Sequence, residues 1–305
     1  MPLVVAALGG NAIVSATDAA AVDLRRAPLA LARLVALGWD LVVTHGNGPQ
    51  VGQRLLEVQA AGNGHAGLDV LDAETAGSVG YRLQQSLGNA LRQVGAPHPV
   101  ATLLTQVVVD PADPAFAAPS KPIGAFYERE AAQVLETRHG FRMVEDAGRG
   151  FRRVVASPEP MEVVELRAIG ALLEAGVVVI AAGGGGIPVV RDAAGALHGV
   201  ESVIDKDRVS SLLACLLRAD LLLIFTSVSE VRLDFRKPEE RPARRLAVRD
   251  ARALLARGQF PAGSMGPKVR AAADFAAATG RPALITSAER VLDALVGTAG
   301  TLVHA

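Results

Sequence analysis

The sequence predicts an α/β fold built on a central, mostly parallel sheet. Short apolar runs typical of strands buried on both faces recur along the chain, as at Leu3–Leu8, Val177–Ile180 and Leu221–Phe225. Stretches with helical apolar spacing lie between them. Glycine-rich turns follow strand ends, at Gly9-Gly10 and at Gly183–Gly186. Strand, turn and helix in repeated alternation is the pattern of a parallel sheet with helices on its faces.

Composition narrows the functional class. The chain has 305 residues, half of them hydrophobic, with 31 basic and 31 acidic side chains. No apolar run reaches the roughly 18 residues of a membrane span, and the start lacks the basic region of a signal peptide. The balanced charge gives no indication of a nucleic-acid partner. The single cysteine, Cys215, excludes an internal disulfide framework and lies in an apolar helical pattern. We therefore expect a cytoplasmic protein that binds neither membrane nor nucleic acid.

Helices and strands of the first 110 residues can be predicted from the spacing of apolar residues and from the positions of glycine and proline. Gly38 is a plausible helix C-cap, and the glycine-rich loop Thr44–Gly52 follows the second strand. The expected helices are Ala20–Leu37, Gln53–Ala61 and a stretch around Val79–Leu91, and the expected strands are Leu3–Leu8, Asp40–Val43 and Val100–Asp110.

The composition changes after residue 110. Pro111–Pro122 is rich in proline and small residues, so it cannot be helix or central strand throughout. Ile123–Pro160 is polar, with interleaved arginines and acids. A segment with so little apolar content cannot form much core, and we expect about 118–157 to project as a lid or small subdomain.

The second half returns to the alternating pattern. A turn-rich, charged stretch follows Phe225 and shows no clear period. The expected helices are Val163–Leu173, 211–220, Val248–Arg257 and Lys268–Thr279, and the closing strands are Ala283–Thr286 and Thr301–Val303.

Several well-known catalytic motifs are absent. The sequence contains no GxxxxGK[ST], no GxGxxG after a strand, and no HExxH, CxxC or GxSxG. The six histidines are scattered, without metal-ligand spacing. His45 alone lies in a candidate site loop, where a structural or substrate-adjacent role fits better than that of a general base.

What remains is a pattern suited to phosphate. Three glycine loops follow strands, Lys121 and Lys268 stand beside prolines, and Lys206 stands between two aspartates. Backbone N–H groups at glycine turns and helix N-termini bind anions, and phosphoryl transfer needs mainly positioning and cations. Each glycine alone could serve a turn and each lysine alone could be a solvated surface charge. Together they predict a phosphate site.

Asp205 and Asp207 flank Lys206 and have two readings. Carboxylates favour the charged form of nearby lysines, which would let two cations share one phosphate site. Acids are also common at an ordinary helix start, where they complement the helix dipole. The residues alone leave both readings open.

Eight segments resemble the carbamate kinase family, in family order over nearly the whole chain. They are LGGNA (8–12), THGNGPQVG (44–52), GYRLQQ (80–85), TQVVVDPADPAFAAPSKPIGAFY (105–127), FRRVVASPEP (151–160), IAAGGGGIPV (180–189), GVESVIDKDRVSSLLA (199–214) and GQFPAGSMGPKV (258–269). The resemblance implies the amino-acid kinase fold, a three-layer αβα sandwich with a protruding subdomain. It also implies a cytoplasmic homodimer of arginine or purine-nitrogen metabolism that reversibly transfers a phosphoryl group between ATP and carbamate, with Mg²⁺ carried by the nucleotide and no metal-binding residues of its own.

The same resemblance implies roles for individual residues. The carbamate and the transferred phosphoryl group would be held by Gly9, Gly10, Asn11, Gly46, Asn47 and Gly48, and Lys121 would reach carbamoyl phosphate. Lys206 and Lys268 would neutralise the phosphates, and Asp205 would orient the lysines. The nucleotide side would comprise Gly183, Gly184, Thr226, Ser227, Met265 and Lys268. Residues 1–200 would form the carbamate-side lobe, and residues 201–305 the nucleotide-side lobe.

The chain departs from the family pattern in one loop. Where the family usually has TDVD and then a valine-tyrosine pair, this chain has Thr226-Ser227-Val228-Ser229 and then Val231-Arg232. The missing acids and aromatic predict weakened nucleotide binding. Milder changes near Lys121 are Ala118 and Ser120, where the family has Asn and Thr. Two rival readings are a kinase acting on another small carboxylate and a non-catalytic relative that binds carbamoyl phosphate or nucleotide. The retained lysines favour an enzyme.

Overall fold

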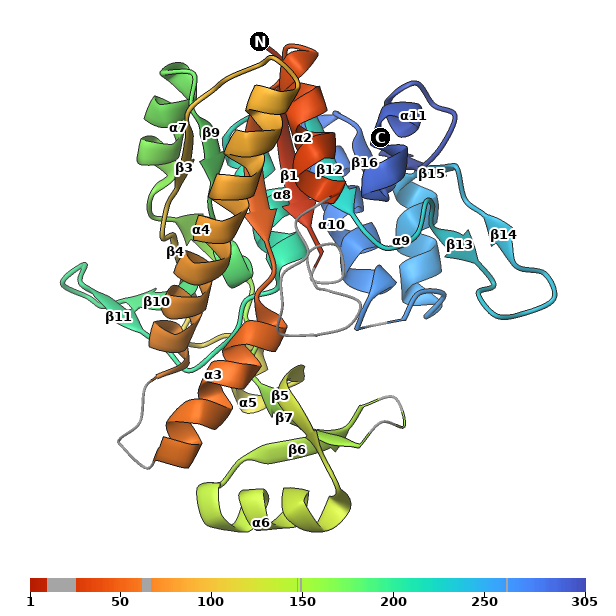
Figure 1. Cartoon of the computed structure of the whole chain (residues 1–305). Coiled ribbons are helices and arrows are strands. Elements are labelled where there is room, and N and C mark those ends of the chain that lie inside the picture. The colour runs from red at the N-terminus through yellow and green to blue at the C-terminus, as the bar shows by residue number, and fades with distance from the viewer. Residues whose placement is uncertain (10–25, 62–66, 147, 149, 262) are drawn as a thin grey trace.

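A computed structural model describes residues 1–305 apart from 10–25, 62–66, 147, 149 and 262. Figure 1 shows a large twisted sheet between helical layers, with a small lobe of strands and one helix below it. The chain is therefore an α/β protein of the predicted class.

The central sheet is mostly parallel, as predicted. Its eight strands lie in the order β15-β17-β16-β12-β1-β2-β9-β3, and every neighbouring pair except β16–β17 is parallel. The strands are β1 (Leu3–Leu8), β2 (Asp40–His45), β3 (Val100–Thr102), β9 (Val178–Ile180), β12 (Leu221–Phe225), β15 (Arg245–Ala247), β16 (Ala283–Thr286) and β17 (Thr301–His304).

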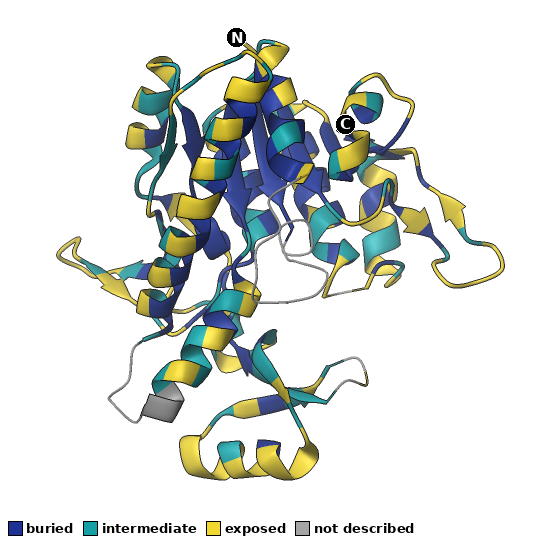
Figure 2. Ribbon diagram, in the orientation of Figure 1, coloured by how far each residue is buried: buried dark blue, intermediate teal, exposed yellow. Residues whose placement is uncertain are grey.

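Alternate side chains of the sheet enter two cores. In β1, Val5 and Ala7 pack toward α8 and α10, whereas Val4, Ala6 and Leu8 pack toward α2 and α4. Because both faces are covered, the central strands are continuous apolar runs, and Figure 2 shows them buried, whereas the edge strands β3 and β15 are partly exposed. The covering helices are α2 (Arg26–Ala36), α4 (Leu68–Gln93), α7 (Leu166–Glu174), α8 (Lys206–Leu216), α9 (Val248–Ala256), α10 (Met265–Thr279) and α11 (Val291–Leu295).

The predicted single strand Val100–Asp110 is wrong, because the chain changes sheets within it. After β3, Leu103 N still bonds to Ile180 O. Thr105 Oγ1 then donates to Leu103 O (3.0 Å) and accepts from Ala182 N (2.9 Å), which turns the chain away. The continuation belongs to a second sheet with the order β11-β10-β4-β8, formed by β4 (Gln106–Val109), β8 (Pro160–Val163), β10 (Ile187–Arg191) and β11 (Leu197–Gly199).

The polar middle segment forms a small lobe. A three-stranded sheet, β5-β7-β6, carries one helix, and α3 packs against β5. Most of the lobe's surface is exposed or half-buried (Figure 2), because it contributes few buried apolar residues, among them Ile123, Met143 and Val154. Its elements are β5 (Lys121–Tyr127), α6 (Arg129–His139), β6 (Arg142–Glu145) and β7 (Phe151–Val155), with α5 (Pro114–Ala117) just before it and α3 (Gly48–Ala61) in the main body.

Several helices begin earlier than predicted. The helix α3 starts at Gly48, with Pro49 in its first turn, where a missing N–H costs nothing. The helix α8 starts at Lys206, because the Asp205 side chain accepts the N–H of Asp207 as an N-cap. The helices α4 and α10 also extend past the predicted starts, and the first part of the predicted helix Ala20–Leu37 lies outside the described residues.

Candidate active site

The site forms where parallel strands end together. Leu8, the last residue of β1, lies in register with His45 of β2 and Phe225 of β12. Gly9, Gly46 and Thr226 therefore leave the sheet side by side. Ligands of open α/β sheets bind beyond this carboxyl edge.

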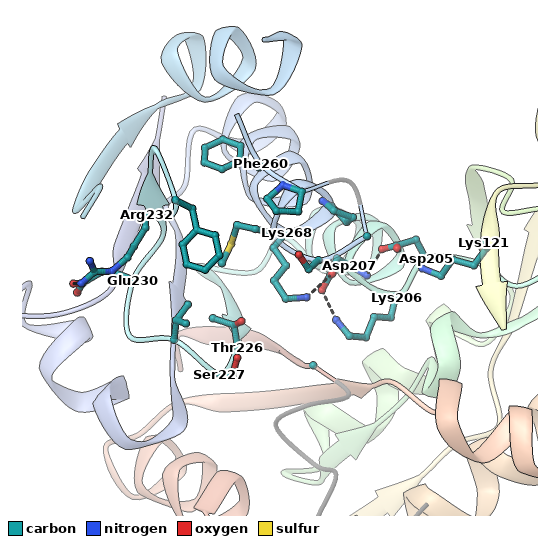
Figure 3. Close-up of a pocket in the computed structure, with 18 residues that line it drawn as sticks. Lys121, Asp205, Lys206, Asp207, Thr226, Ser227, Glu230, Arg232, Phe260 and Lys268 are labelled. Atoms are coloured by element: carbon teal, nitrogen blue, oxygen red, sulfur yellow. Dashed lines mark hydrogen bonds and ion pairs between the residues drawn. The ribbon is translucent and has the colours of Figure 1, made fainter. Parts of the chain in front are cut away.

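A cavity of about 380 Å³ opens at this edge (Figure 3). The chain contains four lysines, and three of them line the cavity, Lys237 being the exception. Of the residues predicted for the site, the cavity brings together Gly9, Lys121, Asp205, Lys206, Thr226, Ser227, Met265 and Lys268; it is also lined by Asp207, Val228, Glu230, Arg232, Phe235, Phe260, Pro261, Gly263, Ser264 and Pro267.

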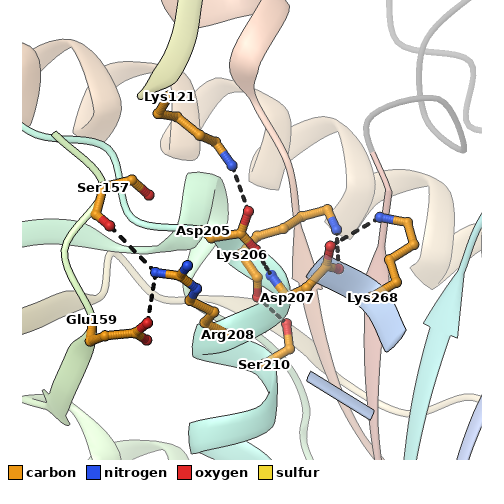
Figure 4. Close-up of polar contacts among 9 residues, drawn as sticks. All are labelled: Lys121, Ser157, Glu159, Asp205, Lys206, Asp207, Arg208, Ser210 and Lys268. Carbon is orange, nitrogen blue, oxygen red and sulfur yellow. Dashed lines mark hydrogen bonds and ion pairs between the residues drawn. The ribbon is translucent and has the colours of Figure 1, made fainter. Parts of the chain in front are cut away.

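Lysines and aspartates alternate along the cavity wall (Figure 4). Lys121 Nζ donates to Asp205 Oδ2 (2.6 Å). Asp207 Oδ2 accepts from Lys268 Nζ (3.0 Å), and its other carboxylate oxygen accepts a hydrogen bond from Lys206 Nζ. Asp205 is thus both helix cap and counter-charge, so the two readings left open by the sequence coexist. Among these contacts, Asp207 holds Lys206 and Lys268 together, whereas Asp205 holds Lys121.

Local electrostatics keep both carboxylates ionised. Burial alone raises the pKa of Asp205, but the charge and hydrogen bond of Lys121, followed by the charge of Lys206, hold it well below its usual range. The pKa of Asp207 is lowered in the same way, with burial outweighed by Lys206 and Lys268. Burial and the neighbouring Lys206 lower the pKa of Lys268, and Asp207 opposes that shift. The result is a dense, nearly balanced set of charges suited to an anionic ligand.

The far end of the cavity is aromatic and includes the divergent loop. Arg232 does not stand alone there, because its guanidinium lies 2.9 Å from Glu240 Oε1 and 3.8 Å from Glu230 Oε1. The buried Phe260 lies at this end (Figure 3), and Phe235, 48% exposed, also lines the cavity. An aromatic surface and a carboxylate therefore remain at the cavity, supplied by positions other than those predicted from the sequence.

The four-glycine turn lies behind the cavity and does not line it. It forms a short 3₁₀ turn at Gly183–Gly185, with left-handed φ at Gly184 (76°) and Gly185 (107°). A Cβ on Gly184 would lie 2.3 Å from Asp72 Oδ1, and one on Gly185 would lie 2.3 Å from Ile204 O. In the described structure these glycines let protein atoms approach closely, whereas the family resemblance places Gly183 and Gly184 on the nucleotide side.

The loop after β2 rests on a buried polar cluster. Asn47 Nδ2 donates to Asp72 Oδ1 (2.6 Å) and to Thr75 Oγ1 (2.9 Å). Burial raises the pKa of Asp72 to about 7, and burial lowers that of His45 to about 4. Gly46, Asn47 and Gly48 adjoin the same sheet edge without lining the cavity, and Gly10 and Asn11 lie outside the described residues.

Sequence reasoning missed Asp72 as a functional candidate. It stands in an amphipathic helix, where an acid is normally a solvated surface residue. A signal for its burial is that it occupies the helical face of Leu68, Leu71 and Thr75, which are all buried.

Two further properties concern ligands and membranes. Among the described residues, no three or more His, Cys, Asp or Glu side chains cluster so as to hold a metal ion. No helix in the described parts of the chain has the length and apolarity required to cross a bilayer.

Known proteins similar to this chain agree with one another in family. The sequence profile of the amino acid kinase family matches residues 2–287. The carbamate kinase of Thermococcus kodakarensis is 44% identical over 313 residues, covering 99% of both chains. The carbamate kinase-like protein YqeA of Escherichia coli is 44% identical over 306 residues, covering 98% of both.

A solved structure supports the same relationship. The carbamate kinase from Giardia lamblia bound to AMP-PNP superposes with a TM-score of 0.89, at 41% identity, covering 99% of this chain and 98% of that one. The parallel sheet, the lysine-lined cavity at its carboxyl edge and these full-length similarities lead to one conclusion. The chain belongs to the amino acid kinase family.

Proposed function

We propose that this protein is a carbamate kinase, which reversibly transfers a phosphoryl group between ATP and carbamate to give ADP and carbamoyl phosphate. The observation that carries the proposal is the convergence of Lys121, Lys206 and Lys268 in one cavity. They occur in a chain 44% identical to a carbamate kinase over nearly its full length.

Lys206 and Lys268 act on the transferring phosphoryl group. Their side chains are each 13% exposed, and Asp207 holds both, so they are positioned before substrate arrives. Preorganised cations in a water-poor site stabilise charge that develops on the equatorial and leaving oxygens. Carbamate is already an anionic nucleophile, so the reaction requires no side chain to remove a proton.

The two ends of the cavity suit the two substrates. The nucleotide occupies the end lined by Ser227, Phe235, Phe260 and Met265, where an aromatic surface faces the base. The Giardia relative bound to AMP-PNP, an ATP analogue, supports nucleotide binding in this fold. The carbamate or carbamoyl phosphate occupies the end near Gly9 and Lys121, beside the loop 46–48.

The residues of the cavity fit a Mg²⁺ ion that the nucleotide would carry. Asp205 and Asp207 are the acids beside the lysines, and each is already engaged by at least one lysine amine. Mg²⁺ in kinase sites is typically held by substrate phosphates and water with few protein carboxylates. The residues present therefore do not form a dedicated cage, and they fit an ion that would be held mainly by the nucleotide, with Asp205 and Asp207 beside it, and would supply positive charge to neutralise the phosphates.

The decisive test is ATP formation from ADP and carbamoyl phosphate with Mg²⁺ and purified protein. We expect activity in the native protein and its near-complete loss in Lys206→Met, with retention in Lys237→Met, which changes the one lysine outside the cavity. Acetyl phosphate, offered as a second donor, tests the rival carboxylate acceptor. Binding of ADP without turnover of either donor would instead indicate a non-catalytic relative.

The biological setting extends this proposal. We infer a homodimer, a cytoplasmic location and a place in arginine breakdown, where carbamoyl phosphate is converted to ATP. We also infer that residues 1–200 carry the carbamate side, with 118–157 as a lid, and that residues 201–305 carry the nucleotide side. Light scattering of the purified protein tests the dimer.

A further inference from the structure

Asp72 is a buried carboxyl group to which the proposed reaction gives no role. It lies at the start of the second turn of α4 and is 2% exposed. Its Oδ1 accepts a 2.6 Å hydrogen bond from Nδ2 of Asn47, the residue that precedes α3. Asp72 therefore touches the loop that, under the proposed function, receives the carbamate end of the substrate.

The Asn47 amide is held from several sides. Its nitrogen also donates to Thr75 Oγ1 (2.9 Å), and the Thr75 hydroxyl in turn donates to Leu71 O (2.8 Å). Gly184 lies against the amide so closely that a Cβ there would be 2.5 Å from Nδ2. Since Asn47 O also accepts Val51 N, the side chain that Asp72 holds belongs to a residue that anchors the first turn of α3.

The surroundings of Asp72, burial above all, bring the pKa of its carboxyl group close to neutral pH. Burial raises its pKa to about 7 and the charge of Asp69 adds to this, while the bond from Asn47 opposes it. His45, from β2, has its pKa lowered to about 4 by burial and supplies no charge at neutral pH. Of the other charged groups on or near this end of α4, Glu74 pairs with Arg54 of α3, and Glu201 caps Leu68 N.

We propose that Asp72 is a positioning residue for the acceptor loop: it fixes Asn47, and the loop binds its anionic substrate more tightly when the Asp72 carboxyl is uncharged. This inference rests on the proposed function. An ionised carboxylate directly behind the loop repels an incoming anion, with little water between to screen it. By linkage, substrate binding in turn favours protonation of Asp72.

The first test compares KM for carbamoyl phosphate in the native protein and Asp72→Asn between pH 6 and 8. The amide keeps an oxygen that accepts from Asn47 but cannot ionise. We expect KM of the native protein to rise about three- to tenfold relative to the variant over this range, as a group with a pKa near 7 loses its proton. KM for ADP should have the same pH dependence in the native protein and in Asp72→Asn. Ionisation of the substrates affects the native protein and the variant equally, so it cancels in the ratio of their KM values.

Asp69→Asn is the matched control. It removes a neighbouring charge on the same helix, so the pH dependence should persist with its midpoint moved to lower pH. Asp72→Ala loses both the charge and the acceptor, and its KM for carbamoyl phosphate should be raised at every pH. Equal pH dependence in the native protein and Asp72→Asn, with both folded by circular dichroism, would overturn the proposal.

A second measurement needs neither turnover nor a stable variant. In protein labelled with ¹⁵N-asparagine, the side-chain amide signals of Asn47 should shift with a midpoint near pH 7. Signals that stay fixed between pH 6 and 8 would contradict the Asp72–Asn47 link. Absence of ATP formation in the native protein would overturn the proposed function instead, and the amide titration would still decide whether Asp72 controls Asn47.

Discussion

Lys121 Nζ lies 2.6 Å from Asp205 Oδ2, which joins the first strand of the small lobe to the N-cap of α8. The contact spans 84 positions of sequence and places one lysine at the junction of two structural units. A second ion pair, between Arg208 and Glu159 (2.9 Å), supports the same junction (Figure 4). The lobe is therefore tied to the cavity wall by ion pairs, in addition to the apolar cluster that Ile123 and Val155 form with residues of α3 and α4.

Replacing Lys121 by Met should destabilise the protein by about 1–2 kcal/mol at pH 7, because Asp205 stays buried without its main partner. The value is below that of a fully buried pair, since the Lys121 side chain is 33% exposed. The folded-state pKa of Asp205 is depressed, so its contribution is present above its unfolded pKa near 4 and is lost as the pH falls below that. Urea unfolding at pH 7 and pH 3 should show the difference between native protein and variant shrinking in acid. Lys237→Met, at an exposed pair, should show almost no difference at either pH.

Replacing Lys206 or Lys268 by Met should reduce kcat far more than it raises KM. Removing a cation that stabilises a phosphoryl-transfer transition state costs on the order of 10³ to 10⁵ in rate. Steady-state rates of ATP formation give kcat and KM separately for each variant, again with Lys237→Met as the control lysine substitution. A Lys206→Met enzyme with near-native kcat would remove this residue from the mechanism.

Phe235→Ala should weaken ADP binding by about 1–3 kcal/mol, the range found for aromatic–base stacking in single-stranded nucleic-acid sites. The residues on either side, Asp234 and Arg236, have left-handed φ (52° and 62°), and Glu240 accepts the N–H of Arg236. A left-handed conformation is energetically costly for non-glycine residues. The hydrogen bond to Glu240 helps to hold Phe235 in this turn. Calorimetry with ADP measures the effect. Phe126→Ala, an aromatic change in the small lobe, is the control, and equal affinities in both variants would argue against Phe235 as a base contact.

The alternation of strands and helices was predictable because buried parallel strands leave apolar runs that few other structures produce. The bounds of β1 and β12 agree with prediction for this reason. Helix starts such as Gly48 and Lys206 were missed because their first turns are polar and are fixed by caps and tertiary contacts. The split of 100–110 between two sheets depends on the Thr105 hydroxyl bonding to Ala182 N, far away in sequence.

The candidate site was predictable only in part. Lysines beside proline, as at Lys121 and Lys268, or between two acids, as at Lys206, stand out locally, so all three could be predicted from the sequence. Asp207 was noticed as a flanking acid, but its contacts with both Lys206 and Lys268 arise only when α8 and α10 pack together. Phe235 carries no local signal, and the signal of Asp72, its place on the buried face of α4, predicts burial but not its contact with Asn47.

The small lobe should exchange amide hydrogens faster than the central sheet. It buries few apolar side chains, and local opening costs least where such contacts are few. Peptides covering 121–145 should exchange well before those covering Val178–Ile180, and carbamoyl phosphate with ADP should slow them if the lobe closes over the cavity. Hydrogen exchange with mass spectrometry makes the comparison. Equal protection of the amides from exchange in both regions, unchanged by ligand, would contradict a lid that closes over the cavity.

Gly184→Ala should be strongly destabilising, whereas Gly195→Ala should cost much less. Both glycines have left-handed φ, 76° and 87°, so each substitution carries the same backbone cost of about 1–2 kcal/mol. Around Gly195 a Cβ meets nothing within 4 Å, but at Gly184 it would collide with Asp72 and Asn47. That collision adds about 1–3 kcal/mol of overpacking strain, and it pushes on the hydrogen bond that holds the acceptor loop. Urea unfolding of the two variants isolates the steric part as their difference. If Gly184→Ala were as stable as Gly195→Ala, close packing of Asp72 and Asn47 would not be the reason for a glycine at position 184.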